Sequence, residues 1–429
     1  MSNQNKPNSA KEEQTKNALV PKLRFPEFRG EVLRCVQLGD VTEEARSRNG
    51  NKHSIASVMG VTKSEGIVPM EARLIAADIA RYKLVEHDWF AYNPMRLNIG
   101  SIARWKGEHE ILVSPDYVVF KCLTKSASSI APAYLDHLRE TKTWKEFVTE
   151  GGDGSVRVRI YYKDIARVGL ALPSFHEQQK IADCLTSLDD LITAQARKVD
   201  ALKTHKKGLM QQLFPRKGET QPRLRFPEFR ESGEWEEKPL SSFCKVGDID
   251  HKMPSSVAEG IPYVMTGDFF GINNIDFHNS KKISFDDYEK LSKKIKPERG
   301  DIVMARYASV GAVRHIETSI QFLVSYSCAI IKCERSENSK FLYYILQSED
   351  IQSRIGAEIN MSSQKNIGID SIKKLKSFLP NPVEQKKIAT CLTTLDTQIT
   401  TEIQKLATLK THKKGLMQQL FPSPEVFES

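Results

Sequence analysis

Two long stretches of the chain place apolar residues at alternating spacings of four and three, which is the seven-residue period of a coiled-coil helix. Polar residues interrupt the first seam at Gln195 and Lys206 and the second at Glu402 and Lys413. An apolar seam on a lone helix would face water, so we expect two helices of about 38 residues, roughly 55–60 Å long, that pack on each other. The seam residues are Ile181, Leu185, Leu188, Ile192, Leu202 and Leu209 in the first stretch, and Ile388, Leu392, Leu395, Ile399, Leu409 and Leu416 in the second.

These two stretches are copies of each other. The fourteen letters LKTHKKGLMQQLFP stand at 202–215 and again at 409–422, and LPSFHEQQKIADCLTSLDDLI at 172–192 matches LPNPVEQKKIATCLTTLDTQI at 379–399. A shorter motif, LRFPEFR, begins at Leu23 and recurs at Leu224, whereas the segments in between are much less alike. The repeat predicts two copies of one unit, each a variable globular part followed by a constant helix. Constant helices suggest a shared partner, and variable parts suggest different targets.

The variable parts combine strands and helices. The runs at 110–122 and 322–333 are rich in β-branched and aromatic residues, which is typical of strands. The segments at 131–148 and 340–355 follow them and have the pattern of helices. Each globular part is therefore expected to be a mixed α and β domain.

The net charge of +9 and pI near 9.0 favour a polyanionic partner such as nucleic acid. The seven cysteines are scattered without a C-x-x-C pair, which indicates reduced thiols and a cytoplasmic protein. No apolar run approaches the length of a membrane span.

Basic and amide side chains recur at matched places in both copies. Arg reads guanine, Asn and Gln read adenine, and Lys holds phosphate. One such loop is more often a solvated surface, but its recurrence in both copies favours a DNA-binding role. The candidates in the first copy are Arg96, Asn98, Arg104, Lys106, Ser155, Arg157 and Arg159, and those in the second are Arg306, Tyr307, Arg314, Ser362, Gln364, Lys365 and Asn366.

Catalytic motifs are weak. The tetrapeptide YNPM at 92–95 lacks the second proline and the aromatic residue of an amino-methyltransferase loop. Pro115–Asp116 with Glu140 and Lys142 fits the spacing of a metal-dependent nuclease, but the second copy has no equivalent lysine. Neither a phosphate-binding G-x-x-x-x-G-K-[ST] loop nor a His and Cys cluster with metal spacing occurs. The sequence predicts binding surfaces and no metal site or catalytic residues.

The spaced pair LPxxxEQxKIAxCLTxLD and LKTHKKGLMQQLFP, present twice, resembles the DNA specificity subunit of type I restriction–modification systems. The LRFPEFR openings resemble those of Gram-positive bacterial members, and the resemblance spans about Val20 to Pro422. It implies two target-recognition domains, each reading half of a split double-stranded DNA target. It also implies spacer helices that set the gap and dock two modification subunits.

The resemblance implies that the chain is non-catalytic and binds no cofactor itself. S-adenosylmethionine, ATP and Mg²⁺ would belong to the modification subunits and to two restriction subunits. The expected fold class is α+β, with two recognition domains alternating with two helices that form an antiparallel coiled coil. The expected segments are an arm at 1–19, recognition domain 1 at 20–175, spacer helix 1 at 176–215, a linker at 216–222, recognition domain 2 at 223–382, spacer helix 2 at 383–422 and a tail at 423–429.

Two alternatives remain from the residues alone. A coiled-coil scaffold would bind DNA without sequence preference. A self-sufficient methyltransferase or nuclease would act through the YNPM or Asp116, Glu140 and Lys142 matches.

Overall fold

The computed structural model describes residues 21–124, 129–150, 159–333, 338–359 and 365–422. Contacts divide the chain into two compact units. Unit 1 comprises Met1–Ala194 together with Leu406–Ser429, and unit 2 comprises Gln195–Lys405. The predicted arm and tail lie outside the described residues.

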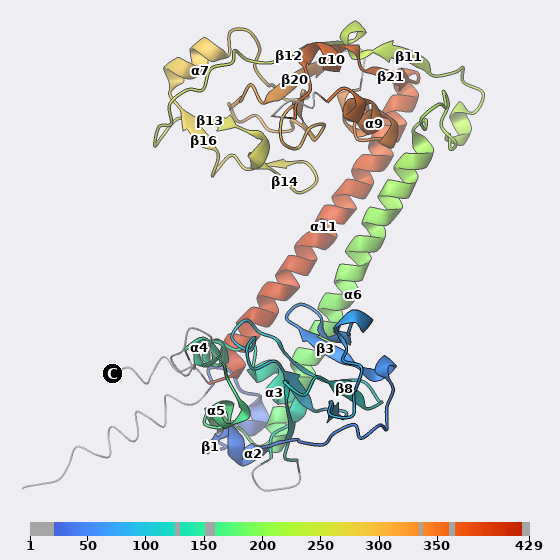
Figure 1. The fold of residues 1–429 in the computed structure, drawn as a ribbon. Helices are drawn as coiled ribbons and strands as arrows, with labels where there is room; N and C mark the ends of the chain where they lie inside the picture. The colour runs from blue at the N-terminus through green and yellow to red at the C-terminus, as the bar shows by residue number, and fades with distance from the viewer. Residues whose placement is uncertain (1–20, 125–128, 151–158, 334–337, 360–364, 423–429) are drawn as a thin grey trace, which may run out of the picture. The chain divides into compact units, whose positions relative to one another are not determined.

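The two predicted long helices are present. Helix α6 spans Phe175–Leu213 and helix α11 spans Pro382–Leu420, each an uninterrupted helix of 39 residues (Figure 1). Helix α11 begins at Pro382, whose ring suits a first turn, and α6 begins two residues after Pro173. Each helix ends two residues before the next proline. The predicted recognition domains, at 20–175 and 223–382, contained neither long helix. Each compact unit of the structure instead contains part of both long helices.

Unit 1 contains a four-stranded sheet in the order β2–β9–β6–β7 and the strand pairs β1–β10, β3–β4 and β5–β8, all antiparallel. Its strands are β1 Arg34–Gln37, β2 Thr42–Glu44, β3 Met59–Thr62, β4 Gly66–Pro69, β5 Lys83–Val85, β6 Phe90–Tyr92, β7 Ile102–Arg104, β8 Ile111–Val113, β9 Val118–Cys122 and β10 Gly169–Leu172. Its shorter helices are α2 Leu38–Val41, α3 Pro132–Leu138, α4 Lys142–Glu150 and α5 Tyr162–Ile165, with 3-10 turns η1 Pro26–Phe28, η2 Ile55–Ser57 and η3 Ala72–Leu74.

Unit 2 repeats that plan. Its four-stranded sheet has the order β12–β20–β17–β18, beside a sheet β16–β13–β19 and the pairs β11–β21 and β14–β15. Its strands are β11 Glu236–Pro239, β12 Cys244–Gly247, β13 Ile261–Val264, β14 Phe269–Phe270, β15 Asn274–Ile275, β16 Lys281–Ile283, β17 Ile302–Ala305, β18 Val313–His315, β19 Leu323–Val324, β20 Cys328–Cys333 and β21 Lys376–Leu379. Its shorter helices are α7 Phe285–Leu291, α8 Ser339–Ile345, α9 Glu349–Ala357 and α10 Ile369–Lys374, with 3-10 turns η4 Pro227–Phe229, η5 Leu240–Ser242 and η6 Thr266–Asp268.

The predicted single strands and single helices are each divided in two. The run at 110–122 forms β8 and β9 in different sheets, because a turn closes between them with the Tyr117 amide donating to the Ser114 carbonyl. The run at 322–333 forms β19 and β20 around a matching bond from Cys328 to Ser325. Likewise 131–148 forms α3 and α4, and 340–355 forms α8 and α9. The interruption falls at Thr141 and Ser348, residues that favour a helix start over a helix interior.

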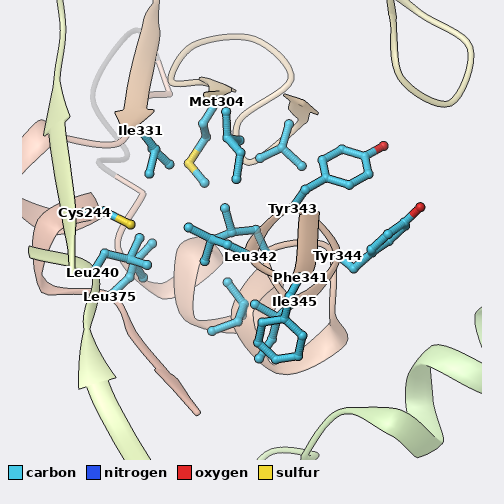
Figure 2. Packing of buried hydrophobic residues seen from close by; sticks show 14 of the residues in the cluster. Leu240, Cys244, Met304, Ile331, Phe341, Leu342, Tyr343, Tyr344, Ile345 and Leu375 are labelled. Atoms are coloured by element: carbon cyan, nitrogen blue, oxygen red, sulfur yellow. The ribbon is translucent and has the colours of Figure 1, made fainter. Parts of the chain in front are cut away.

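In each unit, the end of one long helix completes the hydrophobic core. In unit 1, Phe421 packs against Tyr134 of α3 with ring centroids 5.1 Å apart. In unit 2, Phe214 lies 5.7 Å from Phe341 of α8 in the cluster of Figure 2. The figure also shows the hydroxyl ends of Tyr343 and Tyr344 directed away from that cluster.

The repeated RFPEF and EQ motifs bind each other within each unit. Arg24 forms a two-pronged ion pair with Glu177 of α6, whose side chain is 1% exposed, and Arg225 does the same with Glu384 of α11. The next residue, Gln178 or Gln385, binds backbone groups of the adjoining loops. A planar guanidinium facing a carboxylate is specific in direction as well as charge. This clamp fixes the start of each long helix on its globular part and accounts for the conservation of both motifs between the copies.

Candidate nucleic-acid interface and docking surfaces

A rigid loop follows β6 in unit 1. The Asn93 side chain accepts the Met95 amide at 3.0 Å, and the loop closes at Gly100, whose φ of +90° suits glycine. Leu97 is buried and anchors the loop, which leaves the predicted readers Arg96 and Asn98 exposed. Within the described residues, neither side chain has an ion pair or a hydrogen bond. Both are therefore available to an external ligand.

The structure brings a second predicted segment to this loop. The Ile160 amide donates to the Pro94 carbonyl at 3.1 Å, so the exposed Arg159 is tethered beside the loop. Ser155 and Arg157 lie outside the described residues. The exposed Arg159 therefore lies on a segment that is hydrogen-bonded to the loop carrying the exposed Arg96 and Asn98.

Arg104 and Lys106 lie elsewhere in the same unit and have internal partners. Arg104 is 12% exposed and binds Asp88 at 2.7 Å and Asp136 at 3.3 Å, while Lys106 approaches Asp136 at 3.4 Å. Burial alone would raise the pKa of Asp136, but Arg139, Lys106 and Arg104 outweigh it and the pKa is lowered. This network fastens α3 to the sheet, so the geometry favours a positioning role for Arg104.

The equivalent loop of unit 2 is held by Arg306, which is 5% exposed. Its guanidinium pairs with Asp248 and donates to the carbonyls of Ile367 and Tyr326, each at 3.1 Å. The Ile367 amide returns a bond to the Arg306 carbonyl, the counterpart of the bond from Ile160 to Pro94. Arg306 therefore ties several segments together and its donors are occupied by the protein itself.

Aromatic side chains lie near Arg306 and its partners. The rings of His251 and Tyr326 stack at 4.8 Å, and Tyr307 meets Tyr326 edge-on at 6.4 Å. The His251 side chain is 59% exposed. Such rings suit stacking against bases or sugars. Sequence reasoning identified Tyr307 but missed His251 and Tyr326, because they are separated in sequence and converge only in the fold.

Arg314 lies apart from that cluster, against the hairpin of β14 and β15. It donates to the Asn274 carbonyl at 3.0 Å and its guanidinium lies 4.9 Å from the Phe269 ring centre. Burial lowers the pKa of Arg314, and no carboxylate pairs with it among the described residues. Lys365 is exposed, and Asn366 forms an antiparallel β-bridge with Tyr307. Ser362 and Gln364 lie outside the described residues.

Residues of the two catalytic matches make structural contacts. The Asn93 side-chain oxygen accepts a hydrogen bond from the Met95 amide, and Glu140 forms an ion pair with Lys413 at 3.1 Å. In the part of the chain that the structure describes, no group of three or more His, Cys, Asp or Glu side chains is arranged to hold a metal ion. These contacts give the nuclease and methyltransferase matches no structural support.

The polar residues that interrupt the helix seams bind polar residues of the other long helix. Gln195 donates to the Glu402 carboxylate at 2.7 Å in unit 2. Lys206 binds Asp396 at 2.6 Å in unit 2, and Lys413 binds Asp189 at 2.7 Å in unit 1. Partner numbers on α11 fall as those on α6 rise, so the helix segments run antiparallel, as expected. Paired polar groups at a seam fix the register of two helices.

The repeated fourteen residues have a packed face and an exposed face. Residues on the packed face contact their own unit, which explains their identity in both copies. The exposed positions are also identical, yet internal packing does not require it. They are Lys203, Thr204, His205, Lys207 and Gln212 on α6, and Lys410, Thr411, His412, Lys414 and Gln419 on α11.

Among the described residues, no helix is both long and apolar enough to cross a membrane.

Comparisons with known proteins agree on one family. A model described as the type I restriction modification DNA specificity domain matches residues 232–411. The protein of Methanocaldococcus jannaschii that bears the name MjaX type I restriction enzyme specificity subunit is 24% identical over 357 residues, 80% of this chain and 79% of that protein. The MjaVIII specificity subunit of the same organism is 24% identical over 287 residues, covering 65% of this chain and 67% of that protein.

Among solved structures, the S subunit of a type I restriction–modification system from M. genitalium has the same fold. It aligns with a TM-score of 0.58 at 12% identity and covers 94% of this chain and 99% of that chain. The fold, the doubled helix motifs and the family match agree with one another. Residues 232–411 match the type I restriction modification DNA specificity domain, and most of the chain is similar to type I restriction enzyme specificity subunits.

Proposed function

We propose that each globular part reads one half of a split, asymmetric double-stranded DNA target. One observation carries this proposal: the same loop position in the same fold bears different chemistry in the two units. Unit 1 exposes Arg96, Asn98 and Arg159, whereas unit 2 has an aromatic group around Tyr307 and Tyr326. Readers that differ in this way would select different half-sites.

The paired helices act as the spacer between the half-sites in this proposal. Their length is fixed by sequence and their register by the polar pairs at Glu402, Asp396 and Asp189. A fixed spacer would make the gap in the target constant, because DNA rises by a fixed amount per base pair.

The identical exposed residues of the repeated stretch dock two copies of one modification subunit, and two restriction subunits join that complex. As a specificity subunit, the chain supplies recognition and assembly rather than catalysis. S-adenosylmethionine, ATP and Mg²⁺ accordingly bind the partner subunits. The cysteines are free thiols, which suits a reducing compartment and a cytoplasmic complex.

Selection from random DNA tests the reading function. The chain, assembled with its modification subunits, is used to recover bound duplexes at near-physiological salt. We expect two unlike fixed half-sites separated by an unselected gap of constant length. Exchanging the globular part of unit 1 for that of another family member should change one half-site only. Recovery of random DNA would instead favour a scaffold without sequence preference, and a continuous site would refute the split target.

A further inference from the structure

Each unit has a groove at the end of its long helix, and the two grooves occupy equivalent places in the repeat. In unit 1, the groove lies between the end of α11 and the start of α4. In unit 2, it lies between the end of α6 and the start of α9. The cavities have volumes of about 670 and 400 Å³. Each is large enough to receive a few side chains of a partner.

One wall is identical in the two grooves. Met417, Gln418, Phe421 and Pro422 line it in unit 1, and Met210, Gln211, Phe214 and Pro215 line it in unit 2. A lysine stands at the rim of this wall: Lys414 lines the groove of unit 1, and its counterpart Lys207 lines a cavity that adjoins the groove of unit 2. Neither lysine has an ion pair among the described residues. This shared wall combines an apolar floor with an unpaired cation.

The opposite wall differs in charge. In unit 1 it carries Lys142 and Lys145, and Lys22 also lines the groove. The position of Lys142 is taken in unit 2 by Glu349, which accepts a hydrogen bond from Gln211 at 3.1 Å across the groove.

The complete charge sets reinforce that difference. The groove of unit 1 has four lysines facing Glu140 and Glu146, with Lys142 lying 3.5 Å from Glu146. The groove of unit 2 has Arg216 and Lys217, with Lys207 at its rim, against Glu349 and Asp350. The excess of cations over carboxylates is therefore two in unit 1 and one in unit 2, so the groove of unit 1 is the more cationic.

We infer that both grooves receive the same segment of the modification subunit, an apolar side chain bordered by carboxylates, and that unit 1 binds it more tightly. This inference rests on the docking function proposed above. The exposed edge of the shared wall, which includes Lys414 in unit 1 and Lys207 in unit 2, meets the same partner residues in both units, because the two partners are copies of one chain. The unpaired lysine on that wall would form an ion pair with a carboxylate of the partner segment. The variable wall then attracts the carboxylate in unit 1, while Glu349 repels it in unit 2, so the two subunits assemble in a fixed order.

Site-specific cross-linking tests this order. A photoreactive amino acid is placed at Gln419 or at Gln212, which are matched exposed positions beside the grooves, and each protein is titrated with the modification subunit. At roughly 50 mM salt we expect about five- to tenfold tighter cross-linking at Gln419, because few ions screen the exposed lysines. At roughly 0.5 M salt the two midpoints should approach each other.

Exchanging the charges, with Lys142→Glu and Glu349→Lys in one chain, should reverse the order. The control pair Lys163→Glu and Glu289→Lys makes the same charge changes at exposed positions outside the grooves and should leave the order intact. Equal midpoints at low salt, or an unchanged order after the exchange, would overturn the inference while leaving docking and DNA reading in place. Two bound subunits by mass with no cross-link at either position would place docking elsewhere and also overturn it. Failure of any subunit to bind would reject the docking proposal itself.

Discussion

The ion pair between Arg24 and Glu177 should be a main determinant of the stability of unit 1. Its carboxylate side chain is 1% exposed and its guanidinium 6% exposed, so water contributes little to either charge. Arg24→Met keeps the aliphatic stem but leaves the buried carboxylate alone. Removing one partner of a buried pair costs about 3–5 kcal/mol, mainly because the remaining charge is unpaired.

Hydrogen–deuterium exchange measures this effect in one unit against the other. Peptides covering β1 and β10 in unit 1 should exchange about a hundredfold faster or more, since every 1.4 kcal/mol is about tenfold. Peptides covering β11 and β21 in unit 2 should keep their protection. Arg225→Met should give the mirror-image result, because Glu384 is equally buried.

The double variant Arg24→Met with Glu177→Met separates charge from packing. It removes both charges and should recover most of the lost protection, as replacing a buried pair by apolar residues is often nearly neutral. A single variant that changes exchange by less than about fivefold, or a double variant as unstable as the single one, would refute this account of the clamp.

Three further outcomes follow from individual contacts. Lys206→Met should destabilise the chain by about 2–3 kcal/mol in urea unfolding, since its partner Asp396 is only 13% exposed. Lys413→Met should cost about 1 kcal/mol, since both of its partners, Asp189 and Glu140, are more than a third exposed; equal costs would contradict the burial argument. Burial, with Lys340 nearby, lowers the pKa of His315 to about 4. The unfolded chain therefore takes up the proton first, and stability should fall by up to about 3 kcal/mol as pH drops from about 6.5 to 4. His315→Gln should flatten that dependence in unfolding experiments across this pH range, and an unchanged slope would reject it. Arg96→Ala should weaken binding to the selected DNA by about 1–3 kcal/mol in anisotropy titrations and relax the preference at one position of one half-site; uniform weakening on all sequences would make it a phosphate contact.

The long helices were predictable because their seam is a local pattern repeated over many turns. The segmentation of the globular parts was not, since the apolar runs before and after Ser114 and Ser325 look continuous although each passes into a different sheet. Turn residues marked those breaks, but only pairing with β5 or β13 decides that two sheets are present.

The candidate readers show the same limit. Arg96 and Arg306 both follow a buried strand in a basic loop, and sequence alone gives them equal standing. Asp248, which lies far away in sequence, neutralises and buries Arg306, while no carboxylate among the described residues does so for Arg96. Burial of an arginine depends on such distant partners. Sequence therefore located the loops but could not rank the side chains within them.

The division of the helices between the units has a consequence for synthesis on the ribosome. Unit 2 is continuous in sequence, from Gln195 to Lys405, so its core can close once that stretch has emerged. Unit 1 is encoded first, yet its core includes Leu420 and Phe421. At about 5–20 residues per second, the ribosome needs about 10–40 s to pass from Ala194 to Leu406. Unit 1 therefore cannot complete its core until residues 406–421 have been synthesised. A premature stop before Leu420 would leave the core of unit 1 incomplete, whereas unit 2 would keep all of its residues.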